Sequence, residues 1–219
     1  MDELIKARKH MVDNQLRTSG ITDWRILAVM SSIPRENFVP ESHRVVAYSD
    51  KYLPVTIGNG PTRYLGAAAP FAKLVQLADV GPSDTVLDVG AATGYSTAVL
   101  AGLAASVTGL EIDPAMVTAA NVHLSALGID NAKVVPGPLA DGVKGQYSVI
   151  VVEGMVASVP EPLLDQLADG GRLVALIANG GPAVAHIFVR TGNEVAGRAE
   201  FNANLPPLPL EPQALAFEF

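Results

Sequence analysis

The chain has 219 residues, of which 49% are hydrophobic, and a formal net charge of −7 at pH 7. These values suit one packed α/β domain with a small extension, argue against a disordered chain and make nucleic acid an unfavourable partner. The absence of cysteine excludes disulfides and fits a cytoplasmic location, while no apolar run reaches the length of a membrane span.

The first forty residues are expected to form helices. Apolar residues recur at helical spacing in "DELIKARKHMVDNQL", and Gly20 is a stop signal. Thr22 or Asp23 can cap a second helix, in which Trp24 is expected to pack the two helices together. Residues 34–70 hold several prolines and glycines without a sustained period, which predicts loops and a short strand before the helical "FAKLVQLADV".

From residue 84 onward, short strands alternate with helices, which predicts a parallel doubly wound sheet. The expected strands are "TVLDVG", "SVTGLEID", "AKVVPG", "YSVIVVEG" and "GRLVALIA", with helices over residues 96–104, 114–127 and 162–167. The segment "AVAHIFVRTGNEVAGRAEF" predicts an antiparallel hairpin with a tight Thr-Gly-Asn turn, followed by a Pro-rich tail extended over the surface. We therefore expect residues 1–80 to be a helical and loop extension that packs on a core of residues 81–219.

The glycine-rich turn after "TVLDVG" is the clearest ligand signal. Open α/β sheets bind ligands at the carboxyl ends of their strands, and Gly90 and Gly94 allow a sharp turn and close approach of the backbone. A dinucleotide fingerprint needs G-x-G-x-x-G, but Ala92 takes the place of the middle glycine. Asp88 would repel a pyrophosphate yet could pair with an α-amino group, and Glu111 ends the next strand, where an acid binds ribose hydroxyls. The two acids favour S-adenosylmethionine; an NAD-type oxidoreductase and simple helix capping by these acids remain as alternatives.

Several stretches carry a family resemblance. "DVGAATGYSTAVLA" followed by "LEIDP" resembles the class I methyltransferases. "MVDNQLRTSGITDWRILAVMSSIPRENFVP", "AYSDKYLPVTIGNGPT" and "YSVIVVEGMVASVPEPLLDQLADGGRLVALI" are similar to the protein-L-isoaspartate O-methyltransferases. The resemblance implies a seven-stranded Rossmann-like doubly wound sheet with a reversed last strand. It also implies a repair enzyme that transfers a methyl group from S-adenosylmethionine to the carboxylate of an isoaspartyl residue in a protein or peptide.

The resemblance also assigns site residues by position. It implies cofactor contacts from Asp88, Gly90, Ala91, Ala92, Thr93, Gly94, Tyr95, Ser96, Glu111, Ile112, Gly137, Pro138, Leu139 and Glu153. It implies substrate contacts from Ile57, Gly58, Asn59 and Gly60 and a catalytic role for Thr62, to which we add Arg63 as a candidate of our own. No metal is expected, because no two of the four histidines have ligand spacing.

The acceptor half departs from the family pattern. Thr62 matches a family threonine, but Ala68 stands where a serine is usual, and two extra residues lie between. Pro138 replaces an acid expected near the adenine, and Glu153 stands where the family has threonine. Arg63 can replace the missing hydroxyl, because a guanidinium binds a carboxylate in bidentate fashion. Three alternatives stay open: an active isoaspartyl enzyme, a methyltransferase with another acceptor, and a cofactor-binding protein without turnover.

Overall fold

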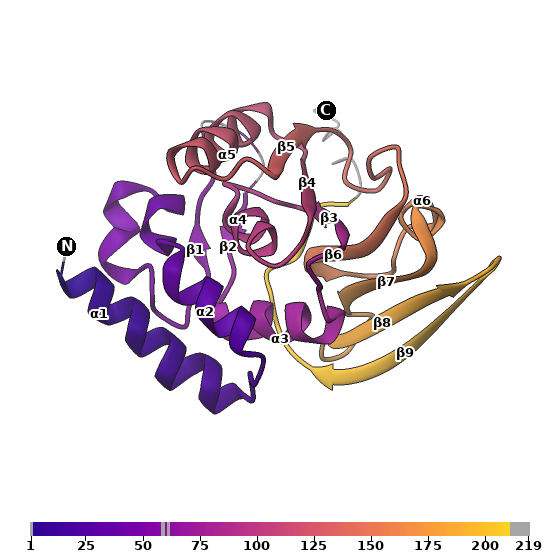
Figure 1. Cartoon of the computed structure of the whole chain (residues 1–219), viewed down its shortest axis with the longest axis horizontal. Helices are drawn as coiled ribbons and strands as arrows, with labels where there is room; N and C mark the ends of the chain where they lie inside the picture. The colour runs from indigo at the N-terminus through magenta and orange to yellow at the C-terminus, as the bar shows by residue number, and fades with distance from the viewer. Residues whose placement is uncertain (1, 58–59, 61, 211–219) are drawn as a thin grey trace, which may run out of the picture.

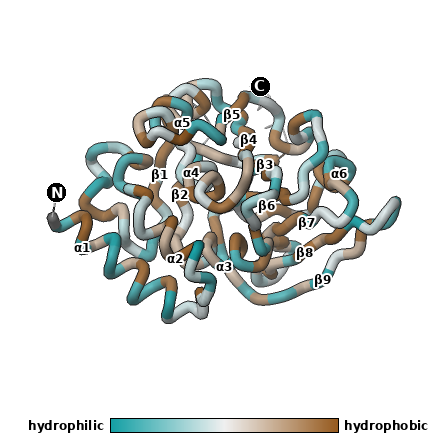
Figure 2. The backbone as a smooth tube through the Cα atoms, viewed as in Figure 1, coloured by the Kyte–Doolittle hydropathy of each residue, from teal (hydrophilic) through white to brown (hydrophobic). Residues whose placement is uncertain are grey.

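The computed structural model describes residues 2–57, 60 and 62–210. The N-terminal helix α1 (Asp2–Met11) continues through a π turn (Val12–Leu16) and a 3-10 turn (Arg17–Ser19) until Gly20, at φ 85°, ends it. This left-handed conformation favours glycine, so the stop signal in the sequence is confirmed. Figure 2 shows α1 as alternating hydrophobic and hydrophilic stretches, as expected of a helix that packs along one side.

Helix α2 (Trp24–Ser32) begins where the sequence places its cap. The Asp23 side chain accepts a hydrogen bond from the backbone N–H of Arg25 at 2.8 Å, which satisfies a free donor of the first turn. The expectation for Trp24 is wrong: its side chain is 74% exposed. The helix instead buries Ile26, Leu27 and Met30, whose spacing of one, three and four residues defines its inner face.

The Pro-rich region contains more regular structure than the sequence predicts. It forms the 3-10 helices Arg35–Phe38 and Glu41–Val46 and a two-stranded antiparallel sheet, β1 (Leu53–Pro54) with β2 (Tyr64–Leu65). Helix α3 (Ala68–Ala78) follows and packs against the main sheet. The strands β1 and β2 are therefore the two arms of an antiparallel hairpin.

The main sheet has seven strands in the order β5-β4-β3-β6-β7-β8-β9 (Figure 1). The strands are β3 (Thr85–Val89), β4 (Ser106–Glu111), β5 (Ala132–Pro136), β6 (Tyr147–Val156), β7 (Leu167–Ile177), β8 (Val184–Thr191) and β9 (Glu194–Asn202). Helices α4 (Tyr95–Ala101), α5 (Pro114–Ala126) and α6 (Glu161–Asp165) connect them. The first five strands are parallel, and the order reverses between β4 and β6 on either side of β3, so the expected doubly wound sheet is confirmed.

The hairpin at the end of the sheet is also confirmed, with two differences of detail. The pairing of Thr191 with Glu194 leaves a two-residue turn, Gly192-Asn193, in which Gly192 has φ 58°. Strand β8 is antiparallel to both β7 and β9, so the reversed strand is the sixth, and β9 again runs with the parallel strands. The reason is geometric, because a two-residue turn can join only antiparallel neighbours.

Both faces of the sheet are buried. One apolar cluster joins the N-terminal helices, α3, α4 and α5 to one face, while the other face packs on a second cluster that includes Leu163 of α6. The first cluster runs from Met11 to Leu205, so residues on either side of position 80 share one core. Burial on both faces explains why "YSVIVVEG" lacks an alternating pattern. None of the described helices is long and apolar enough to cross a membrane.

The expectation that the tail merely extends over the surface is wrong for its described part. Residues 203–210 turn back across the end of β6, where the Met155 N–H donates to Pro206 O and the Leu208 N–H donates to Met155 O, both at 2.9 Å. Leu205 and Leu208 are only 2% and 6% exposed. Packing of these apolar side chains against Gly66, Gly90 and Gly154 removes them from water and stabilises the fold. Residues 211–219 lie outside the described part of the chain.

Candidate cofactor and acceptor site

The turn after β3 is held against the end of β4. The N–H groups of Gly90 and Ala91 both donate to Leu110 O, at 2.8 and 3.1 Å. Gly90 and Gly94 have φ values of 91° and 94°, and Ala92 also adopts a left-handed φ of 47°. Such conformations fold the chain back sharply, so α4 starts directly above the strand end and the backbone of the turn faces the pocket.

Glu111, at the end of β4, is fully buried and accepts hydrogen bonds at both carboxylate oxygens. Its Oε2 accepts from Ala92 N at 2.8 Å, and its Oε1 accepts from the N–H groups of Ile112 and Asp113 at 2.9 and 3.3 Å. Arg63 donates to Oε2 through Nη2 at 3.0 Å and Nε at 3.3 Å. The protein itself therefore satisfies the whole carboxylate.

Asp88, in β3, is fully buried but only half satisfied. Its Oδ2 accepts from Ser96 Oγ at 2.8 Å and Thr97 Oγ1 at 2.5 Å, while Oδ1 has no partner among the described residues. Burial raises the pKa of Asp88 to about 6; the Thr97 and Ser96 hydrogen bonds oppose this, and the Glu111 charge adds to it. The free oxygen is an acceptor left for a ligand.

Glu153 lies within β6, one residue beyond the last pairing of this strand with β3. The pairing of Val89 with Val152 puts Glu153 level with the glycine turn. Its Oε1 is buried and lacks a hydrogen-bond partner within the described chain. Burial, and then the Asp88 charge, raise the pKa of Glu153 well above its ordinary value. The two carboxyl groups are thus neighbours, and a cation bound beside them would stabilise the ionised form of both.

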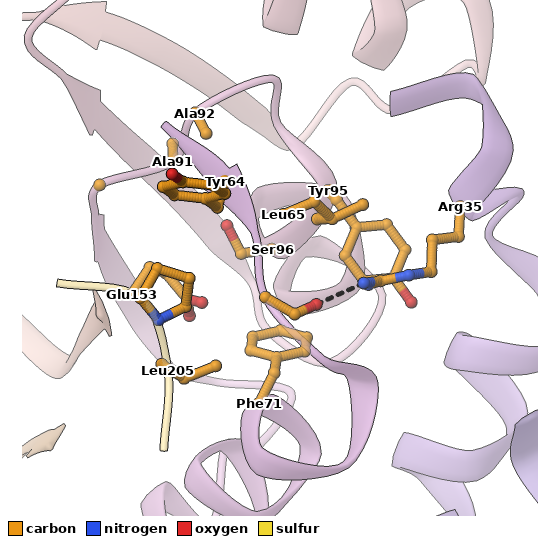
Figure 3. Close-up of a pocket in the computed structure, with 13 residues that line it drawn as sticks. Arg35, Tyr64, Leu65, Phe71, Ala91, Ala92, Tyr95, Ser96, Glu153 and Leu205 are labelled. Atoms are coloured by element: carbon orange, nitrogen blue, oxygen red, sulfur yellow. Dashed lines mark hydrogen bonds between the residues drawn. The ribbon is translucent and has the colours of Figure 1, made fainter. Parts of the chain in front are cut away.

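Glu153 and the glycine turn line a pocket that Figure 3 shows in close-up, whereas Asp88 and Glu111 do not line it. Tyr64 and Glu153 lie on one side of it, Tyr95 and Arg35 on the other, and Phe71 lies at its base. The Arg35 guanidinium is 4.9 Å from the centre of the Tyr95 ring and donates to the Gly66 carbonyl. Burial lowers its pKa. The space left between the side chains is about 30 Å³, far below the roughly 300–1,000 Å³ of typical ligand sites.

Four other residues predicted to contact the cofactor lie after β5 and in the glycine turn. Gly137, Pro138 and Leu139 follow β5, where the Gly137 N–H donates to Glu111 O at 3.1 Å. Thr93 donates from Oγ1 to Phe38 O at 2.6 Å, so its hydroxyl holds the N-terminal region rather than the pocket.

On the acceptor side, Gly60 lies against the turn after β4, since a Cβ there would be 1.9 Å from Asp113 Oδ2. Ile57 is partly buried and Thr62 is exposed. Gly58 and Asn59 lie outside the described residues. Gly60 thus lies beside Asp113, two residues after Glu111.

Sequence reasoning missed three contributions to this site. Thr97 is the second hydroxyl on Asp88, and Arg35 lines the pocket from the "PRENF" stretch. From the tail, Leu205 lines the pocket and Leu208 lies against Gly90. Leu205 and Leu208 in "NLPPLPL" are three residues apart, so the alternating pattern of a half-buried strand does not predict their burial.

Comparison with known proteins identifies the family. A model of the family Protein-L-isoaspartate(D-aspartate) O-methyltransferase (PCMT) matches residues 6–204. The chain belongs to this family. It is 38% identical over 184 residues to the protein-L-isoaspartate O-methyltransferase of Koribacter versatilis, covering 83% of this chain and 80% of that protein. It is 39% identical over 181 residues to that of Methanoculleus marisnigri, covering 80% of this chain and 78% of the relative.

Solved structures of this family share the fold. One protein-L-isoaspartate O-methyltransferase matches with a TM-score of 0.81 at 24% identity, covering 92% of this chain and 65% of that chain. The present chain thus spans just under two thirds of that structure's length. A Plasmodium falciparum structure, described as a protein-L-isoaspartate O-methyltransferase in complex with S-adenosyl-L-homocysteine, matches with a TM-score of 0.76 at 24% identity, covering 93% and 99% of the two chains. The family membership leaves no support for the NAD-type alternative.

The residues of this chain fit S-adenosylmethionine on the side of the amino acid. The unpaired Asp88 Oδ1 and Glu153 Oε1 are buried acceptors suited to an ammonium group. On the nucleoside side, Glu111 stands where an acid accepts ribose hydroxyls, but Arg63 lies on it in this conformation. Among the described residues, no group of three or more potential metal ligands is clustered.

Proposed function

We propose that the protein is an S-adenosylmethionine-dependent methyltransferase that methylates the carboxylate of isoaspartyl residues in proteins or peptides. The observation that carries the proposal is the half-satisfied Asp88, whose buried free oxygen lies one strand away from the ribose-binding position of Glu111. Buried acceptors are rarely left unpaired, so this one indicates a cationic ligand. Family membership supports the reaction class. The lack of cysteine supports a cytoplasmic location.

The chain's own residues then have defined tasks. Asp88 and Glu153 hold the α-ammonium group, and Glu111 accepts the ribose hydroxyls. The turn from Gly90 to Ser96 supplies backbone close to the ligand. Thr62 and Arg63, in the loop beside the pocket, orient the acceptor carboxylate, Arg63 once it has left Glu111, since its guanidinium can bind both oxygens.

The chemistry asks little of the protein beyond position. When bound, S-adenosylmethionine would supply a methyl group activated by its sulfonium, for transfer to the acceptor carboxylate with S-adenosylhomocysteine as the leaving group. An ionised carboxylate needs no general base, so no proton moves. Charge is lost in the transition state, and exclusion of water with in-line alignment supplies the acceleration. The pocket lined by Tyr64, Glu153 and the glycine turn supports this role.

Methyl transfer to a matched pair of peptides tests the proposal. Radiolabelled S-adenosylmethionine is incubated with the protein and an isoaspartyl peptide, or with its normal aspartyl twin. We expect label in the isoaspartyl peptide alone, as a base-labile ester, and inhibition by S-adenosylhomocysteine. Absence of label above the aspartyl control, with cofactor binding intact, would contradict the isoaspartyl assignment.

A methyltransferase with a different acceptor is the second candidate, and Glu153 favours it. The Glu153 carboxyl group lines the pocket from β6, and an ionised acid there repels an anionic acceptor. It could instead accept a proton from a neutral nucleophile. Label that appears in proteins but not in isoaspartyl peptides, as a base-stable product, would support this candidate.

A further inference from the structure

Arg63 lies inside the nucleoside part of the site. Its side chain is 4% exposed, and Nη2 donates both to Glu111 Oε2 at 3.0 Å and to Gly90 O at 2.8 Å. The backbone is held there as well, because Arg63 N–H donates to Thr56 Oγ1 at 2.8 Å and Val55 N–H donates to Arg63 O at 3.0 Å. The guanidinium therefore links the ribose-binding acid to the glycine turn.

Leu208 fills the space above the same turn. A Cβ on Gly90 would lie 2.6 Å from Leu208 Cδ1 and 3.1 Å from Arg63 Nη2. The room that a glycine keeps open for a ligand is thus taken by two side chains from distant segments. The tail that carries Leu208 is held by its two backbone hydrogen bonds to Met155. The small pocket of Figure 3 borders the same turn at Gly90.

We propose that this conformation is an autoinhibited state, in which Arg63 and Leu208 compete with the cofactor for the site. The nucleoside binds only when Arg63 leaves Glu111 and Leu208 moves off Gly90. The inference rests on the proposed function for the identity of the cofactor. It adds that the protein's own arginine sets how tightly that cofactor binds.

Glu111 does not depend on Arg63 for its position. Three backbone N–H groups, of Ala92, Ile112 and Asp113, hold both of its oxygens. A variant without the guanidinium therefore keeps the acid in place for ribose hydroxyls. If only a fraction of the molecules is open, the apparent Kd is the intrinsic Kd divided by that fraction, so removal of the competitor tightens binding.

Calorimetric titration with S-adenosylhomocysteine tests this on the full chain. We expect Arg63→Gln to bind it about tenfold more tightly than the unaltered protein, because the open state becomes more populated. Leu208→Ala is expected to tighten binding in the same direction, through a different contact. Arg44→Gln, which removes an exposed guanidinium, is the matched control and is expected to bind as the unaltered protein does.

Thermal unfolding provides the reciprocal measurement. Arg63→Gln is expected to unfold at a lower temperature without ligand, since Glu111 loses its partner, and to gain more from saturating S-adenosylhomocysteine than the unaltered protein. Equal or weaker binding by Arg63→Gln and Leu208→Ala, with the unaltered protein still binding, would overturn the autoinhibited state but leave the proposed function standing. If neither the unaltered protein nor the variants bind S-adenosylhomocysteine, both proposals fail.

Discussion

The carboxylates on three neighbouring strands fall into two groups that differ in their hydrogen-bond partners. Glu111, at the end of β4, has both oxygens occupied by Arg63 and by backbone N–H groups. Asp88, in β3, and Glu153, in β6, each keep one buried oxygen without a partner among the described residues. The β4 end is thus filled from within the chain, while the β3–β6 end is arranged for a positive charge from outside.

The electrostatic consequences follow the same division. Removal of either member of the buried Arg63–Glu111 ion pair leaves the other charge buried without a partner, which destabilises the fold. Burial raises the pKa values of Asp88 and Glu153, and the like charge of Glu111 adds to the shift of Asp88, as that of Asp88 adds to the shift of Glu153. Mutation at one end should therefore change stability first, and mutation at the other end should change binding first.

The largest effect is expected for Glu111→Ala. Loss of this acid leaves the Arg63 guanidinium, which is 4% exposed, without its counter-charge. Breaking a buried ion pair in this way lowers the free energy of unfolding by about 3–5 kcal/mol. Urea unfolding measures it, with the exposed Glu161→Ala as control. A variant as stable as the control would show that the filled end contributes nothing to folding.

Asp88→Ala is expected to affect ligand binding next most strongly. Removal of the buried acceptor should weaken the affinity for S-adenosylhomocysteine about a hundredfold, the usual range for a lost charge-assisted hydrogen bond. The unfolding free energy should change less than in Glu111→Ala, since a self-repelling acid is removed. Calorimetry decides this, with the exposed Asp130→Ala as control; unaltered affinity would mean that Asp88 does not face the ligand.

The pH dependence of folding stability and that of ligand affinity both follow from the raised pKa of Asp88, about 6. The folded chain binds this proton more tightly than the unfolded chain, so the group favours folding below about pH 4 and loses that contribution between about pH 4 and 6. Cation binding needs the ionised form, so the affinity for S-adenosylhomocysteine should rise about tenfold between pH 5 and 7. The two slopes are opposite in sign.

Asp88→Asn, which cannot ionise, should flatten both slopes. Calorimetry and urea unfolding at a series of pH values measure them. A flat affinity profile in the unaltered protein would contradict the assignment of the cation to the β3–β6 end.

The sequence could predict the acids but not what touches them. Asp88 and Glu111 are placed by local rules, since each sits near the end of a short apolar strand with a turn and helix behind it. Their adjacency follows from the parallel pairing of β3 with β4. The Arg63–Glu111 contact joins residues 48 positions apart and depends on a hairpin with two-residue strands, which no periodicity reveals.

Thr97 illustrates the same limit at short range. Helical spacing predicts that it lies near the strand end, but only the packed structure decides that its hydroxyl, and not that of Thr93, faces Asp88. The exposure of Trp24 has a similar cause, because three smaller apolar residues of α2 already fill the core side. Tertiary packing selected among patterns that the sequence left equivalent.

The smallest effect is expected from Thr97→Val, which tests how much one hydrogen bond contributes to the pKa of Asp88. The variant keeps the shape of a fully buried side chain but deletes the 2.5 Å hydrogen bond that stabilises ionised Asp88. The pKa of Asp88 should rise further, and the midpoint of the affinity profile should move upward by about half a pH unit to one unit. Thr118→Val, at an exposed hydroxyl on α5, should leave that midpoint in place. A downward shift in Thr97→Val would mean that the hydroxyl favours the protonated acid, and that Asp88 serves as a donor rather than as the partner of a cation.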